Sequence, residues 1–508
     1  MTVQRVAMGE WTPDMPSTTG TETNNLADAR NVYPNNVGYS PFPTPVAVSP
    51  SADQDLTSVY AGKENALVQV FAGSDQKIYS VYSAGSPVTK RAITYSGDIV
   101  VDSVSRESSP YSISPEAWHF EQFGKTILAV KNNNVIQAWT IGSSIRFNNL
   151  QKVNPDTGEV LSEAPTAKCM SIVRDFVVAG NIDSGDAPNL VKWSDLNDDT
   201  EWRTAKTKPQ SQADSQYIAD GGAIQNITGG EIGIIFLENA VYRMSYVGSP
   251  LFFQFDKIST IGCFEGKSCI EDNGISYYLS NDGFYQTDGS AVTAIGTNKV
   301  DEWFLANANL QELVTMSTTV HPTYKLVIWN FEDNFGKRQN LIYHIESGRW
   351  SRTETLATSV GSVATMGTDL ERLGVLYPRL DTDVPAPLDD RVYMGGKYVF
   401  AGTKGKQMIS FTGACEDPRL ETLDIEVGYQ SVITQARPII DNGQANISVA
   451  SRQALDDTIE FGAVSVPVEN RNNLRSGGRY HRVRVEPVGD SWTTAIATDL
   501  DINPSGQR

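Results

Sequence analysis

One pattern recurs along the chain: a short apolar strand, a polar turn and a second strand that carries aromatic residues. The copies begin at Leu67, Thr126, Phe176, Ile232, Gly274 and Lys325. Ser-Asp, Asn-Asn-Asn, Glu-Asn and Asn-Asp-Gly occupy the turns, where residues that accept positive φ are needed. The flanking strands are rich in Val, Ile, Tyr and Phe, which suit a pleated, half-buried surface. The pattern predicts six antiparallel hairpins.

The copies are spaced by roughly 40–60 residues, which is typical of the blades of a β-propeller. One small sheet cannot bury both of its faces, so blades stack around an axis and cover each other. Two β-sandwiches would explain the strands equally well, but not the period. We therefore predict an all-β fold with a propeller of six blades, or of seven if a strand from elsewhere completes one. Apolar spacing also predicts a helix or helical turn over residues 300–314.

The pattern also divides the chain. Residues 1–60 are predicted to form an extended N-terminal arm with the first strands, and residues 61–365 the propeller. Residues 366–508, which contain RVYMGGKYVFAG and further strand-like runs, are predicted to form a C-terminal β-sandwich-like domain. The Pro- and Asp-rich segment at residues 381–390 is interpreted as a linker or long loop.

The stretch NNLADARNVYPNNVGYSPFPTP shows neither a helical stripe nor strand alternation. We expect an extended segment anchored by Tyr33, Tyr39 and Phe42, with Arg30 as a further contact residue. The anchors could bind the propeller of their own chain, a neighbouring subunit or a partner protein. A simple lead-in strand packed on its own propeller explains the same residues. Deleting residues 1–45 should impair assembly more than folding if the contacts are intermolecular.

A basic stretch, RNNLRSGGRYHRVRV, stands out near the C-terminus. On a strand, Tyr480, Arg482 and Arg484 point to one face and His481 points to the other. The basic face is either solvated or makes an electrostatic contact with an acidic neighbour or a second copy of the chain. We take Arg479, Arg482 and Arg484 as candidate interface residues.

The charge balance of the 508 residues is acidic, with 60 Asp and Glu against 41 Lys and Arg and a formal net charge of −19. Proteins that grip DNA need clustered cations that displace counterions from phosphates. We therefore expect no tight DNA binding over the surface. The N-terminus lacks the pattern of a secretory signal, and no run of 18 apolar residues occurs. We expect a soluble protein without a membrane span, synthesised in a cytoplasm.

Sequence motifs for chemistry are absent. The His residues are isolated from one another: His119, His321, His344 and His481. There is no HExxH, no GxSxG elbow and no phosphate-binding glycine loop. Cys263 and Cys269 are interpreted as half-buried thiols on neighbouring strands rather than as a disulfide. We predict no catalytic residue, metal or cofactor, and therefore no enzyme.

Two Asp-rich turns are the remaining candidates for chemistry. DLNDDTEW at residues 195–202 loosely resembles a calcium loop but lacks the central Gly and the spaced terminal Glu. SNDGFYQTDG at residues 280–289 superficially resembles the Asp-box turn of sialidase propellers, but Gly283 directly follows Asp282, which breaks the order of that motif. We interpret the first as a solvated turn and the second as a plain hairpin turn.

Several phrases taken together resemble a known family. They include the leader LADARNVYPNNVGYSPFPTP, the segments WHFEQFGKTILAV, VKWSDLNDDTEW and DGFYQTDGSAVTAIGTNKVDEWF, and the closing LRSGGRYHRVRVEPVGDSW. Their order resembles that of the tail hub, or tail nozzle, proteins of short-tailed bacteriophages, also called packaged-DNA stabilisation proteins. The likeness spans most of the chain but involves structural phrases only. It carries no catalytic residues.

The resemblance implies a structural virion protein of the phage tail that assembles as a ring, expected to be a homohexamer. The ring would lie below the portal and the head-to-tail adaptor, next to tail fibres or spikes. It would retain the packaged genome and conduct DNA during ejection without reading its sequence. The main alternative is a carbohydrate-binding or glycan-degrading propeller of a tail fibre or receptor-binding protein. A second is a cellular scaffold propeller that binds peptides, although the chain lacks the Trp-Asp dipeptide of such repeats.

Overall fold

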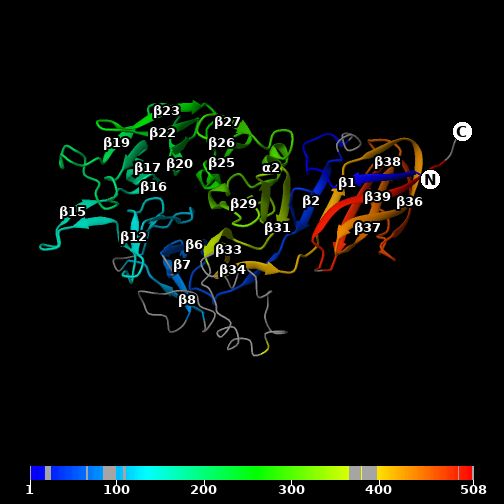
Figure 1. The fold of residues 1–508 in the computed structure, drawn as a ribbon, viewed down its shortest axis with the longest axis horizontal. Helices are drawn as coiled ribbons and strands as arrows, with labels where there is room; N and C mark the ends of the chain where they lie inside the picture. The colour runs from blue at the N-terminus through cyan, green and yellow to red at the C-terminus, as the bar shows by residue number, and fades with distance from the viewer. Residues whose placement is uncertain are drawn as a thin grey trace.

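The computed structural model describes residues 2–17, 24–64, 67–83, 99–106, 110–364, 379, 398–489 and 491–505. Figure 1 shows a β-propeller on one side and a second β unit on the other, with both termini beside the second unit. The predicted linker at residues 381–390 lies outside the described residues. Among the described residues, no helix has the length and apolar character needed to cross a membrane.

The predicted hairpins form the central strands of six blades, and each of these blades is built from four consecutive strands. The first three blades are β6 (Leu56–Glu64), β7 (Leu67–Ser74), β8 (Ile78–Ser83) and β9 (Ile99–Ser103); β10 (His119–Phe123), β11 (Thr126–Val130), β12 (Gln137–Thr140) and β13 (Asn148–Asn149); β16 (Ala167–Val173), β17 (Phe176–Ile182), β18 (Ala187–Trp193) and β19 (Asp214–Tyr217). The next three are β20 (Ile224–Thr228), β21 (Gly233–Leu237), β22 (Ala240–Gly248) and β23 (Phe252–Ser259); β24 (Ile270–Asp272), β25 (Ile275–Ser280), β26 (Gly283–Thr287) and β27 (Val292–Ala294); β28 (Ser317–Val320), β29 (Leu326–Glu332), β30 (Arg338–His344) and β31 (Trp350–Glu354). The prediction of six hairpins wrapped into a propeller is confirmed.

A seventh four-stranded sheet closes the ring, and its strands come from distant parts of the chain. It consists of β32 (Ser359–Ala364), β33 (Tyr398–Lys404), β34 (Gln407–Gly413) and β5 (Thr44–Ala47). The N-terminal strand β5 pairs antiparallel with β34, so that Pro45 lies opposite Phe411. Strand β32 in turn packs against β6 of the first blade. A strand from elsewhere therefore completes a seventh blade, the alternative that the sequence left open.

The described strands divide the chain differently from the predicted boundaries. The propeller takes Thr44–Ala47 from the predicted arm and Tyr398–Gly413 from the predicted C-terminal domain. The physical reason is pairing: an unpaired edge of β34 would expose its backbone donors and acceptors, and β5 satisfies them. Because blades cover one another, central strands are apolar on both faces, and all seven residues of β17 are buried.

The C-terminal unit is β-sandwich-like and is built mainly from long strands. It consists of β35 (Arg419–Thr422), β36 (Ile425–Asp441), β37 (Gln444–Arg452), β38 (Asn472–Val488) and β39 (Thr494–Pro504), with β1 (Thr2–Ala7) from the other end of the chain. Strand β36 lies between β38 and β39, and β37 pairs with the second half of β38. Strand β1 pairs along β39. Both ends of the chain thus belong to one sheet.

The N-terminal segment joins the two units. Strand β2 (Leu26–Arg30) pairs antiparallel with β35 and makes a parallel bridge to β31 of the sixth blade. Strands β3 (Val32–Pro34) and β4 (Tyr39–Pro41) form a hairpin, and β4 reaches β39. A continuous sheet therefore runs from the sixth blade through β2 into the C-terminal unit.

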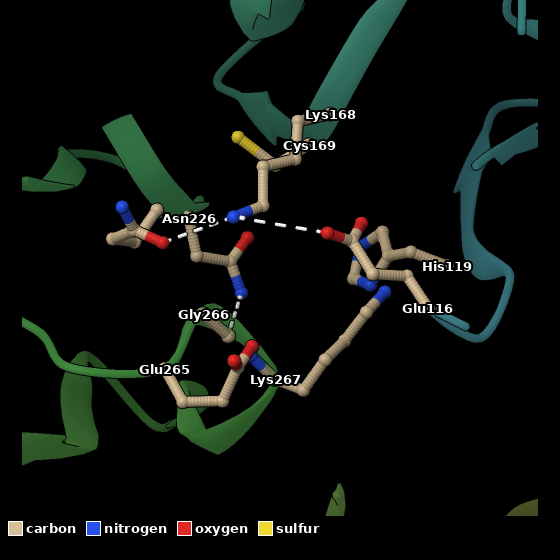
Figure 2. A pocket seen from close by; sticks show the side chains of 9 residues that line it. Glu116, His119, Lys168, Cys169, Asn226, Glu265, Gly266 and Lys267 are labelled. Atoms are coloured by element: carbon tan, nitrogen blue, oxygen red, sulfur yellow. Dashed lines mark hydrogen bonds and ion pairs between the residues drawn. The ribbon is translucent and has the colours of Figure 1, made fainter. Parts of the chain in front are cut away.

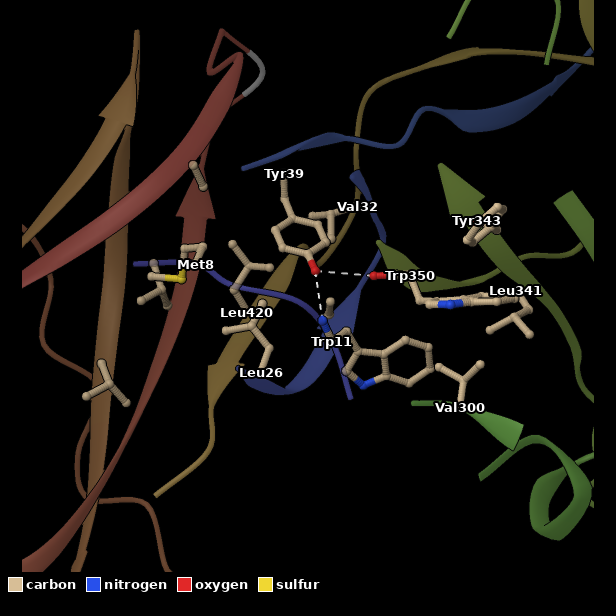
Figure 3. Packing of buried hydrophobic residues seen from close by; sticks show 14 of the residues in the cluster. Met8, Trp11, Leu26, Val32, Tyr39, Val300, Leu341, Tyr343, Trp350 and Leu420 are labelled. Carbon is tan, nitrogen blue, oxygen red and sulfur yellow. Dashed lines mark hydrogen bonds between the residues drawn. The ribbon is translucent and has the colours of Figure 1, made fainter. Parts of the chain in front are cut away.

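One hydrophobic core extends across this junction (Figure 3). Met8, Leu26 and Leu420 contribute from the side of the C-terminal unit, and Trp350 and Leu341 from the sixth blade. All five residues are buried. Because the two units share a sheet and a core, separating them would expose apolar surface and break backbone pairing at the same time.

Helices and a projecting hairpin complete the fold. The helix predicted over residues 300–314 is present as α2 (Asp301–Asn307), followed by the short turn η5 (Leu313–Thr315). It is shorter than predicted because Ala308 adopts an extended conformation. The hairpin of β14 (Gln151–Val153) and β15 (Val160–Glu163) projects from the propeller at the end of the molecule far from the C-terminal unit (Figure 1). Other short turns are η3 (Asp183–Gly185) and η4 (Gly266–Ser268).

Candidate functional site

The four candidate residues of the N-terminal segment all contact their own chain. The Tyr39 hydroxyl accepts a hydrogen bond from the Trp11 N–H at 3.1 Å and donates one to the Trp350 carbonyl at 3.2 Å (Figure 3). The Tyr39 side chain is buried, and this burial raises its pKa. Phe42 is buried between Phe400 and Phe411, whose ring centroids lie 6.0 and 5.8 Å away.

The other two candidates lie at the edge of the same seam. Tyr33 stacks on Tyr324, with 4.9 Å between the ring centroids. The guanidinium of Arg30 pairs with Glu354 at 3.2 Å. The side chains of Tyr39 and Phe42 are therefore unavailable to a neighbouring subunit. Of the alternatives left open by the sequence, the structure has the segment packed within its own chain, where it also closes the propeller through β5.

The basic strand β38 is half-buried, as its alternation predicted, and three of its four arginines are paired internally. Arg482 lies 3.3 Å from Glu421, and Arg484 pairs with the same carboxylate at 3.0 Å. The Arg484 guanidinium also lies over the Phe461 ring at 3.7 Å. Arg479 is more exposed and pairs with Glu426 at 2.9 Å. These arginines thus carry little uncompensated charge.

His481 lies on the inner face of β38 and is buried. One of its ring nitrogens is 2.7 Å from the Ser431 hydroxyl and the other is 2.7 Å from the Ser451 hydroxyl. Burial lowers the pKa of His481 to about 4. The imidazole is therefore neutral at pH 7 and joins β36, β37 and β38 through two hydrogen bonds.

A buried polar cluster, which we call the axial cluster, lies where the first strands of the second, third and fourth blades meet the segment before the fifth blade (Figure 2). The first strands of successive blades contact each other there. Lys267, in η4 before the fifth blade, reaches across and donates a hydrogen bond to the Ala117 carbonyl at 2.8 Å. Lys168 on β16 donates to Gln225 at 2.9 Å and lies 3.8 Å from the Glu116 carboxylate.

Desolvation dominates the electrostatics of this axial cluster. Burial lowers the pKa of Lys267 and raises the pKa of Glu265. The Glu265 carboxylate accepts a hydrogen bond from the Lys267 backbone N–H at 3.0 Å, and Asn226 donates to the Gly266 carbonyl at 2.7 Å. These contacts fix the inner ends of neighbouring blades to one another.

The space enclosed by the axial cluster is about 10 Å³, which holds no more than one water-sized molecule. This space is lined by lysine amines, glutamate carboxylates and the imidazole of His119. It is too small for a substrate to fit between them. Among the described residues, no group of three or more His, Cys, Asp or Glu side chains could hold a metal ion.

The axial cluster was missed by the sequence analysis because its members come from separate blades. Glu116 and His119 lie at the start of the second blade, Lys168 in the third and Gln225 in the fourth. The available signal was a polar residue in or before the first strand of successive copies. The recurrence of these polar residues becomes visible only when the repeated copies are aligned with one another.

The Asp-rich turn at residues 195–202 is an ion-paired turn. Glu201 is buried and pairs with Arg203 at 2.8 Å, which lowers the pKa of the carboxyl to about 2. Lys208 pairs with Asp195 at 2.9 Å. Asp198 is held by Lys152 of the projecting hairpin at 2.5 Å. Because lysine and arginine side chains neutralise these carboxylates, the loop is not arranged around a cation.

The second Asp-rich turn and the cysteines have structural positions. The tip of β25 and β26 is a tight hairpin in which Gly283 has a φ of 146° and packs against the Asp301 carboxylate. None of the four cysteines is joined in a disulfide in the described part of the chain. Cys263 and Cys269 are buried in the connection between the fourth and fifth blades, with 3.5 Å between their sulfurs. They are thiols, as predicted, but they are fully buried rather than half-buried and lie in a connection rather than on neighbouring strands.

Comparisons with known proteins give similarity of fold only. No family model matches the chain, and no curated protein matches it. Among solved structures, the WD40 β-propeller domain of Doa1 is 11% identical, with a TM-score of 0.34, and the match covers 64% of this chain and 93% of that one. YjhT is 10% identical over 60% of this chain and 99% of its own, with a TM-score of 0.33. The computationally designed Ika8 protein is 11% identical over 71% and 97%, with a TM-score of 0.29.

Proposed function

We propose that this chain is a structural subunit of a short bacteriophage tail. It assembles as a ring, expected to be hexameric, below the portal and adaptor, retains the packaged genome and conducts DNA during ejection. The proposal starts from the resemblance of the sequence phrases to tail hub and nozzle proteins. In this role the protein catalyses no reaction and serves as a structural building block of the ring.

The observation that carries the proposal is the junction between the propeller and the C-terminal unit. A thirteen-stranded sheet and one hydrophobic core run through both units. Strands from the N-terminal and the C-terminal parts of the chain both belong to this sheet. Linked domains usually meet at smaller and more polar interfaces, across which they move. A subunit that resists the pressure of packaged DNA needs the opposite property, namely one rigid body.

The charge of the chain supports the same role. With a net charge of −19, a ring of these subunits would present an acidic surface to DNA. Acidic walls repel phosphates, whereas cationic walls would bind them and slow the passage of DNA. The most basic strand, β38, has three of its four arginines paired with carboxylates of the same chain.

The closed propeller axis indicates where DNA would pass. Lys267, before the fifth blade, contacts Ala117, before the second blade, and the space beside them is only about 10 Å³, so a DNA duplex does not fit through the middle of one subunit. The path would therefore lie between subunits, in the lumen of the ring. Such a ring needs two different contact faces on each subunit, because cyclic assemblies of this kind use heterologous interfaces.

The test uses DNA-filled heads that carry portal and adaptor but lack this protein. Purified chain is added, the heads are treated with nuclease, and the protected DNA is measured. We expect added chain to raise the protected fraction to that of complete particles. Equal DNA loss with and without the chain would refute the proposal, and turnover of surface polysaccharide by the chain would favour the glycan-degrading alternative.

A further inference from the structure

An exposed apolar strip lies on the C-terminal unit. Residues 463–468 run beside β37, and Ser465 exchanges two backbone hydrogen bonds with Ile447, at 2.8 and 3.0 Å. In an extended segment, alternate side chains point to the same face. Val464, Val466 and Val468 therefore share a face, and they are 54%, 66% and 63% exposed. Three aligned exposed valines on an extended segment are a feature that monomeric proteins avoid.

Charges around this strip are distinctive. Asp456, Asp457, Glu460 and Glu469 are all exposed, and among the ion pairs of the described residues none involves them. Glu469 lies at the tip of the tight turn that leads into β38, followed by the exposed Arg471. The strip thus offers an apolar edge that ends in an acidic side chain and a basic side chain two residues apart.

A groove on the propeller has matching features. It is a cavity of about 500 Å³ between the sixth and seventh blades, with the buried rings of Phe42 and Phe411 at its base and the exposed Leu356 at its rim. Leu356 is 68% exposed, and Phe335, in the turn that leads into the groove, is 86% exposed. This volume is within the range of sites that bind ligands or side chains of a partner.

The walls of the groove carry opposite charges. Lys337, in the turn between β29 and β30, is exposed and makes none of the ion pairs found in the described part of the chain. The other wall carries Glu416 and Asp417, which are also exposed. A mostly polar groove with an exposed leucine, a cation on one side and carboxylates on the other is complementary to the strip, whose Glu469 and Arg471 have the matching signs.

We propose that the strip at residues 463–468 of one subunit docks in the blade 6–7 groove of the next subunit. This inference rests on the proposed ring and specifies its contact. The strip belongs to the C-terminal unit and the groove to the propeller, so each chain has one of each. A contact between two different faces, repeated from chain to chain, is the heterologous interface that closes a ring. Lys337 faces Glu469, and this pair sets the register of the docking.

The test compares assembly of matched variants by native mass, at a concentration where the wild-type chain forms rings. Val466→Asp and Lys337→Glu should each weaken assembly by at least about tenfold in concentration. Val247→Asp, at a 50% exposed valine on β22, and Lys206→Glu, at an exposed lysine of the third blade, should leave it unchanged. The double variant Lys337→Glu with Glu469→Lys should restore rings, because each contact between subunits then again brings two opposite charges together.

The outcomes separate this inference from the proposed function. Circular dichroism and denaturation midpoints equal to wild type establish that the variants are folded. If wild-type rings form and Val466→Asp forms them equally well, the docking contact is overturned while the ring stands. If the wild-type chain remains a single subunit, both alone and with portal and adaptor, the ring and its contact fall together.

Discussion

Replacing Tyr39 by Phe tests the junction between the two units by removing one oxygen atom. The substitution keeps the buried ring and deletes the hydrogen bonds to Trp11 and Trp350. The Trp11 N–H then stays buried without the only partner it has among the described hydrogen bonds. Leaving such a group unpaired costs roughly 1–3 kcal/mol. We expect the free energy of unfolding to fall by about 2 kcal/mol, a factor of about 30 in the folded-to-unfolded ratio.

The assay for Tyr39→Phe is equilibrium urea denaturation followed by tryptophan fluorescence, since Trp11 and Trp350 both lie at the junction. Hydrogen exchange of the Trp11 amide gives a local measure and should accelerate. Tyr217→Phe is the matched control, because Tyr217 is 60% exposed and should tolerate loss of its hydroxyl. Equal denaturation midpoints for the two variants would show that the Tyr39 hydroxyl does not hold the units together.

Three further predictions follow from buried groups. Phe42→Ala should lower the free energy of unfolding by about 3–5 kcal/mol, because Phe42 fills the space beside Phe400 and Phe411; a loss below about 1 kcal/mol in denaturant would contradict that packing. Burial raises the pKa of Asp301 to about 6, so the folded state binds its proton more tightly than the unfolded state, and wild type should lose roughly 2–3 kcal/mol relative to Asp301→Asn between pH 4 and pH 7. For His481, whose pKa is lowered to about 4, the sign is opposite: the unfolded state takes up the proton first, so wild type should lose roughly 2 kcal/mol relative to His481→Gln between pH 7 and pH 5. Parallel profiles of wild type and variant in either pH series would refute the corresponding assignment.

The blades could be predicted because their information is local. Each hairpin, such as that of β25 and β26, pairs residues only a few positions apart, and its turn residues are visible in the sequence. The alternation in β38 likewise predicted that His481 faces inward and Arg482 outward, as the burial of the strand confirms. Period and turn chemistry were sufficient for these elements.

The closure of the propeller could not be predicted in the same way. Strand β5 pairs with β34, more than 360 residues along the chain, and Thr44–Ala47 contains a proline and no strong alternation. Nothing local distinguishes this segment from a linker. The Tyr39 hydroxyl has the same difficulty, since its partners Trp11 and Trp350 lie far apart in sequence. The aromatic residues of this extended segment indicated that it packs against another surface, but they did not indicate which surface.

The measurement that tests the account most directly is the native mass of the purified chain, alone and mixed with portal–adaptor rings. The account predicts a closed ring, expected to be hexameric, that joins the portal–adaptor complex. A mass that corresponds to one chain in both samples would contradict it.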